Sequence, residues 1–165
     1  MLSKNPNNSN ALKKRGIRYY FNGRNKKAIA DLEKASKLDS TDSEIYNYLA
    51  TCYLGLNNTE LALTNLTIAI QVNKENKFLY FKRGNIYLIN NKFKEAIEDF
   101  TTAIKLYPNE VGGYFYRGTG YYHAGERKLS KKDYHNILHL DPDNRVAKIF
   151  LENFDDEDFW YYRIW

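Results

Sequence analysis

The apolar residues of this chain fall in short bursts with the 3.6-residue period of an α-helix, and polar connections separate the bursts. In the middle of the sequence, Tyr80, Gly84 and Tyr87 lie on one stripe of a first predicted helix, and the polar pair Asn90 and Asn91 follows it. A second burst with the same period comes directly afterwards. Amphipathic stripes of this kind predict two helices joined by a short turn.

The pattern of two bursts recurs every 34 residues without a gap. Three series of small or aromatic residues keep this period: Gly16, Ala50, Gly84 and Gly118; Tyr19, Tyr53, Tyr87 and Tyr121; Ala28, Ala62, Ala96 and Ser130. A fixed period of this length is typical of a solenoid of stacked helical hairpins. The small residues are expected where two helix backbones approach closely, since a missing side chain permits that approach.

These spacings resemble the tetratricopeptide repeat family, whose repeats carry Leu-Gly, Tyr, Ala, an aromatic residue, Ala and Pro in this order. The resemblance covers four repeats, at residues 9–42, 43–76, 77–110 and 111–144. It implies an all-α superhelix of four helix-turn-helix repeats. The departures leave that expectation unchanged, although Arg15, Arg83 and Arg117 replace the usual leucine before the glycine.

Both ends of the chain differ from the repeats. Residues 1–8 are polar, and we expect them to be disordered. Residues 145–165 begin with an amphipathic stretch, from Val146 to Phe154, in the phase of a fifth first helix. Because a solenoid exposes its last apolar face unless something covers it, this stretch predicts a C-terminal capping helix.

Composition limits the classes of function. The 25 basic residues are interleaved with 20 acidic ones, so the net charge of +5 does not favour a nucleic-acid partner. A single cysteine, Cys52, excludes an internal disulfide. No apolar run is long enough to span a membrane, and no leader segment is recognisable. The sequence therefore predicts a cytoplasmic protein without membrane contact.

Three groups of residues are candidates for chemistry. His135 and His139 have the i, i+4 spacing of a zincin metal site, but Asn136 stands where the catalytic glutamate would be needed. We expect Cys52 to be a small buried apolar residue, because the sequence shows no neighbouring base that would activate its thiol. The acidic run 155–158 lacks the alternating ligand spacing of a calcium loop. We expect no catalytic residues, no metal and no cofactor.

A second stripe on each first helix lies opposite the packing stripe, and the resemblance implies that it lines the concave surface. This predicted peptide-binding groove is rich in aromatic residues, which are typical of contact surfaces. Some of the rings could instead pack sideways into neighbouring repeats. Its members are Lys13, Lys14, Ile17, Tyr20 and Phe21; Glu44, Asn47, Tyr48 and Thr51; Phe78, Phe81, Lys82 and Asn85; and Phe115, Tyr116, Thr119 and Tyr122.

The family's best-known groove chemistry is the carboxylate clamp of co-chaperones, in which five polar residues capture the acidic C-terminus of a heat-shock protein. Lys13 and Lys82 keep cations at two clamp positions. Ile17, Tyr48 and Phe78 occupy the other three. Losing three charge-assisted contacts, worth roughly 1.5 to 3 kcal/mol each, argues against a clamp of this type.

The sequence ends on a run of large apolar side chains, namely Phe159, Trp160, Tyr161, Tyr162, Ile164 and Trp165, around Arg163. Such a run should be covered in a soluble protein. Three arrangements remain open: the tail folds back on the capping helix, lies in the groove of the same molecule, or enters the groove of a second molecule and makes a homodimer.

Together these observations predict a non-catalytic scaffold that binds a protein or peptide segment, of unknown identity, in a concave aromatic groove. A self-associating structural subunit is the alternative. An RNA-binding helical repeat is a third possibility, because aromatic and lysine side chains share the groove.

Overall fold

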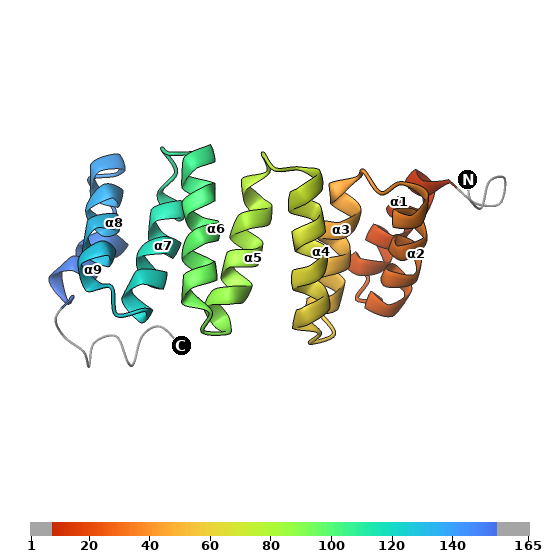
Figure 1. The fold of residues 1–165 in the computed structure, drawn as a ribbon, viewed down its shortest axis with the longest axis horizontal. Coiled ribbons are helices and arrows are strands. Elements are labelled where there is room, and N and C mark those ends of the chain that lie inside the picture. The colour runs from red at the N-terminus through yellow and green to blue at the C-terminus, as the bar shows by residue number, and fades with distance from the viewer. Residues whose placement is uncertain (1–7, 155–165) are drawn as a thin grey trace. The chain divides into compact units, whose positions relative to one another are not determined.

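The computed structural model describes residues 8–154, and within that stretch every regular element is an α-helix (Figure 1). The all-α prediction is confirmed for these residues. The helices are α1 (Ser9–Phe21), α2 (Asn25–Leu38), α3 (Ser43–Leu54), α4 (Thr59–Val72), α5 (Lys77–Ile89), α6 (Phe93–Leu106), α7 (Val111–His123), α8 (Arg127–Leu140) and α9 (Arg145–Glu152). They form two compact units: unit 1 extends to Ile86 and unit 2 begins at Tyr87, within α5.

The turn inside each hairpin depends on one residue in the left-handed backbone region. These residues are spaced by the repeat period: Gly23, Asn57, Asn91 and Gly125, with φ angles of 69°, 57°, 58° and 78°. In the first turn, the backbone N–H of Arg24 donates to the carbonyl of Tyr19 at 2.9 Å, and that of Gly23 donates to Tyr20 at 2.9 Å. This is a Schellman ending, which glycine and asparagine tolerate best.

Close packing of the two helices in a hairpin explains the periodic glycines. A Cβ atom added to Gly16 would lie 2.8 Å from Cγ of Leu32, and one added to Gly118 would lie 2.9 Å from Cε2 of Tyr134. Both distances are shorter than real carbon contacts. The small residues therefore serve helix packing, as the sequence predicted.

Unit 1 is built from neighbouring helices that lie side by side in Figure 1: α1 packs on α2, α2 on α3, and α3 on α4. Asn8, Asp42 and Asn58 cap α1, α3 and α4 through their side-chain oxygens. A buried cluster between the helices forms the core, consisting of Leu12, Ala28, Leu32, Ala35, Ile45, Leu49 and Cys52.

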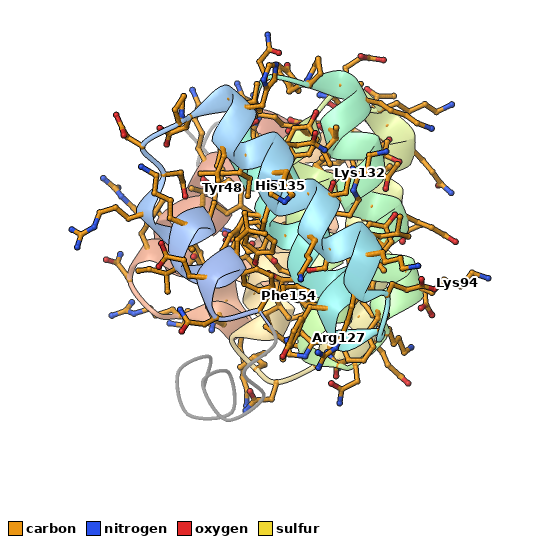
Figure 2. The ribbon with its side chains drawn as sticks, turned by 90° about the vertical axis from the view of Figure 1, so that its left-hand side faces the viewer. Tyr48, Lys94, Arg127, Lys132, His135 and Phe154 are labelled. Atoms are coloured by element: carbon orange, nitrogen blue, oxygen red, sulfur yellow. The ribbon has the colours of Figure 1, made fainter. Side chains whose placement is uncertain are left out.

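Unit 2 stacks α6, α7, α8 and α9 in the same manner. Its last helix covers α8, because the Phe150 ring stacks on Tyr134 with centroids 3.5 Å apart. Phe154 is also buried, beneath Lys131 Nζ at 4.5 Å and the Arg127 guanidinium at 5.9 Å from its centroid. Figure 2 shows Phe154 and Arg127 near each other. Two cations over one ring stabilise this end of the unit.

Ion pairs to buried aspartates join the two helices of a hairpin, and the sequence alone did not predict them. The Arg15 guanidinium donates to both oxygens of Asp31, at 2.5 and 2.6 Å. Arg117 donates to both oxygens of Asp133 in the same way, at 2.8 and 2.7 Å. Two parallel bonds of this type hold the helices in a defined register.

The pairing follows the repeats. In each case the arginine precedes the glycine of the first helix, and the aspartate follows 16 residues later. The third repeat has Arg83 at the equivalent position, and its guanidinium donates to Thr67 Oγ1 of the preceding repeat at 3.0 Å. The second repeat has Leu49 and Asn65 instead. The three arginine substitutions of the sequence are therefore structural.

Candidate peptide-binding surface

Three helices of unit 1 contribute the predicted groove residues: α1, α3 and residues 77–86 of α5. Tyr20 on α1 meets Tyr48 on α3 with ring centroids 5.6 Å apart. Lys82 on α5 reaches Asn47 on α3. These contacts place the three inner-stripe surfaces next to each other, and we call the resulting surface the α1–α3–α5 face.

Two phenylalanine rings on this face are open to solvent. Phe21 is 72% exposed and Phe78 is 66% exposed. Phe21 touches Tyr20 and Tyr48 edge-on, with centroids 5.2 and 6.3 Å away. Exposed rings of this size are uncommon on a surface that contacts only water, and they mark contact sites when they gather on one face.

Lys82 is a half-buried cation between neutral partners. Its Nζ donates to Oδ1 of Asn47 at 2.7 Å and to Oγ1 of Thr51 at 3.1 Å. Desolvation by the surrounding protein lowers the pKa of Lys82. An ammonium group has three N–H donors, so one donor remains, and no carboxylate within residues 8–154 neutralises the charge.

Lys13, another cation predicted for the groove, is already neutralised. Its Nζ lies 2.7 Å from Asp42 Oδ2 and 2.8 Å from Glu44 Oε2. Hydrogen bonds to Asp42 and then Glu44 raise the pKa of Lys13. The sequence treated Lys13 and Lys82 as equivalent cations, whereas the structure gives only Lys82 an unsatisfied charge.

Other predicted members of this surface contribute to packing. Ile17, Tyr20 and Tyr48 lie half-buried against the core cluster of unit 1. Phe81 and Asn85 are also half-buried. Thr51 donates its hydroxyl proton to the carbonyl of Asn47 at 2.9 Å, which leaves its oxygen free to accept from Lys82.

In unit 2 the predicted groove residues pack against other helices of the unit. Phe115 meets Tyr134 edge-on at 6.1 Å, and Tyr116 stacks on Phe100 at 5.4 Å. The Thr119 hydroxyl lies 3.1 Å from that of Tyr134. Tyr122, the remaining member, contacts the buried cluster around Phe150. Sideways packing into a neighbouring repeat, which the sequence left open, is therefore the arrangement of Tyr116, whereas Phe115 packs against α8 of its own hairpin.

Within residues 8–154, the remaining candidates for chemistry are one buried cysteine and two exposed histidines. Cys52 is fully buried, and desolvation raises the pKa of its thiol to about 11. His135 and His139 are exposed on α8, and residues 8–154 hold no cluster of three metal-ligating side chains. Figure 2 shows His135 on this helix. The acidic run and the aromatic residues Phe159, Trp160, Tyr161, Tyr162 and Trp165 lie outside the described residues.

None of the helices in the described part of the chain is long and apolar enough to cross a membrane.

Comparison with known proteins agrees with the repeat architecture. Helical hairpins that repeat every 34 residues define a helical repeat protein. Proteins of this class have extended surfaces. Two sequence profiles described as tetratricopeptide repeat match residues 13–73 and 78–110, which together make up more than half of the chain. The chain belongs to the tetratricopeptide repeat family. No curated protein matches it.

Several solved structures share the fold. The crystal structure of MamA is 28% identical with a TM-score of 0.78, over 86% of this chain and 82% of MamA. The tetratricopeptide domain of Arabidopsis OM64 is 27% identical with a TM-score of 0.57, over 65% of this chain and 88% of that domain. YrrB, described as having an unusual peptide-binding site, is 20% identical with a TM-score of 0.76, over 92% of this chain and 78% of YrrB.

Proposed function

We propose that the protein is a non-catalytic interaction scaffold, and that the α1–α3–α5 face of unit 1 binds a peptide segment of a partner protein. The observation that carries the proposal is the arrangement of two exposed rings, Phe21 and Phe78, on the same face as the charged and unneutralised Lys82. Helical repeat proteins use their extended concave surfaces for such binding.

The exposed rings supply the apolar part of the interaction. Covering one phenylalanine ring contributes roughly 1.5 to 3 kcal/mol, so two rings give a peptide enough apolar free energy to offset part of its ordering entropy. Phe21 is supported from behind by Tyr20 and Tyr48, which keep it in place. Both rings therefore suit aliphatic or aromatic anchors of a peptide.

Lys82 supplies the polar part. Its neutral partners Asn47 and Thr51 fix the position of the ammonium group without cancelling the charge. Because the group is half-desolvated, an incoming carboxylate gains a stronger hydrogen bond than it would at a fully exposed lysine. The face therefore favours a peptide in which an acidic residue lies near apolar anchors.

Selection from a displayed library of random peptides tests the proposal. We expect the protein to enrich peptides that combine an acidic residue with aromatic or aliphatic residues. Phe78→Ala and Lys82→Met should each weaken the selected peptides by about tenfold, equivalent to about 1.4 kcal/mol. The methionine keeps the length and apolar stem of the lysine, so its effect reports the charge.

Matched controls come from α2 of the same unit. Leu38→Ala and Lys37→Met remove one exposed apolar and one exposed basic side chain from that helix. Both variants should bind the selected peptides like the wild type. The proposal fails if no acidic and apolar consensus emerges, or if the α2 variants weaken binding as much as the α5 variants.

A further inference from the structure

The charge of this chain is unevenly distributed. The first repeat, residues 9–42, carries nine basic and four acidic side chains, which equals the formal net charge of +5 of the whole sequence. The acidic counterpart is concentrated elsewhere: residues 155–158 are four consecutive carboxylates, and the aromatic run 159–165 follows them. The sequence thus holds one basic surface and one acidic segment with apolar anchors.

Part of the positive charge of the first repeat is already used within the fold. Arg15 pairs with Asp31, and Lys13 pairs with Asp42 and Glu44. Lys14 and Arg18 are different, because both are exposed and neither contacts a carboxylate in residues 8–154.

These two cations lie in line with the exposed ring of the α1–α3–α5 face. Lys14, Arg18 and Phe21 occupy positions i, i+4 and i+7 of α1, which share one stripe of a helix. Phe21 is the most exposed ring of unit 1. The stripe therefore presents two unpaired cations followed by an apolar contact, in the order that complements an acidic run attached to aromatic residues.

We propose that residues 155–165 of one copy of this chain dock on the α1–α3–α5 face of a second copy. Carboxylates 155–158 lie beside Lys14 and Arg18, and the aromatic residues that follow cover Phe21. The proposal rests on the proposed function of this face and names its occupant. We assign the segment to a second copy because each repeat of a solenoid contacts only its sequence neighbours, and two repeats lie between the first and the last in the sequence.

The docked segment and its acceptor face are different surfaces of the chain. Two copies that exchange segments reciprocally close as a two-fold symmetric dimer, whereas one-way docking leaves one segment and one face free for a further copy. In both arrangements the mass rises with protein concentration, and association weakens with salt because it depends on exposed charges.

Light scattering of the full chain tests the proposal, together with its intrinsic tryptophan emission. The only two tryptophans, Trp160 and Trp165, lie in the proposed segment, so the emission reports on that segment alone. For the wild type we expect the mass to rise with protein concentration and the emission to shift to shorter wavelength in parallel. Raising the salt concentration should reverse both changes.

Two charge-reversal variants separate the α1 stripe from general charge. Lys14→Glu with Arg18→Glu should stay monomeric over the same concentrations. Lys34→Glu with Lys37→Glu makes the same change of net charge on exposed residues of α2, and it should associate like the wild type. Adding Asp155→Lys and Asp156→Lys to the α1 variant should restore association, because the attraction is rebuilt with opposite signs.

The outcomes are distinguishable. A wild type that remains monomeric, or an α1 variant that associates as strongly as the α2 variant, overturns docking of this segment. A tryptophan emission that is shifted in a monomer, and unchanged by the α1 variant, shows that the segment is covered within its own molecule. In either case selected peptides that still depend on Phe78 and Lys82 leave the proposed function standing.

Discussion

The buried pair between Arg117 and Asp133 allows the most quantitative prediction. Asp133 has a side chain only 2% exposed, and the Arg117 guanidinium donates both of its parallel bonds to that carboxylate. Arg117→Leu therefore leaves a carboxylate in the interior without its counterion. Removing one partner of a buried pair costs about 3 to 5 kcal/mol, and we expect a loss of about 3 kcal/mol in the free energy of unfolding.

The second repeat shows how the loss can be recovered. It carries Leu49 and Asn65 at the two positions, and the Asn65 amide donates to the carbonyl of Leu61 at 2.8 Å. An asparagine at position 133 can make the same bond to the carbonyl of Leu129. The double variant Arg117→Leu with Asp133→Asn should therefore lie within about 1 kcal/mol of the wild type, since an apolar replacement of a whole pair is often neutral.

Urea titrations followed by circular dichroism at neutral pH provide the measurement. The four proteins form a double-mutant cycle, in which we expect a coupling energy of about 2 kcal/mol or more. The single variant Asp133→Asn serves as the remaining corner. If the effects of the two single variants simply add, or if Arg117→Leu alone is neutral, the pair does not hold the hairpin together and the reasoning is refuted.

Three further predictions follow from individual sites. Gly125→Ala should destabilise the protein by about 1 kcal/mol, because alanine disfavours the positive φ of this turn, whereas Gly125→Asn should cost less, as thermal unfolding can show. Burial lowers the pKa of His123, which stacks on Phe93. Protonation therefore favours the unfolded chain, and acidification below the ordinary value of 6.5 should reduce the free energy of unfolding more in the wild type than in His123→Phe. The Cys52 thiol should resist a thiol reagent at pH 8 until urea is added, and rapid labelling of the native protein would contradict its burial.

The repeat architecture could be predicted from sequence because it depends on local spacing. Helix pairing and the close approach at Gly16 and Gly118 follow from apolar periodicity and residue size. The ion pairs are not evident when each position is compared only with its counterpart in other repeats. The signal is that the two positions change together, because the second repeat has Leu49 in place of the arginine and Asn65 in place of the aspartate.

The candidate site was harder to predict, because exposure depends on neighbours in three dimensions. Phe78 and Phe115 occur on the same predicted stripe, yet Phe78 is open and Phe115 packs against Tyr134. Lys13 and Lys82 look equivalent in the sequence, but the carboxylates of Asp42 and Glu44 neutralise only Lys13. The period of the sequence shows which residues share a helix stripe. The neighbours of each side chain in the folded protein determine whether it is available for binding.

Photo-crosslinking tests the central claim, peptide binding by the α1–α3–α5 face, most directly. A benzophenone amino acid is placed at Phe78 in one protein and at Leu38 of α2 in another, since both positions are exposed and only the first lies on that face. With a selected peptide, irradiation should crosslink the protein modified at position 78 and leave the other unmodified. Equal crosslinking at both positions, or crosslinking at position 38 alone, would contradict the account.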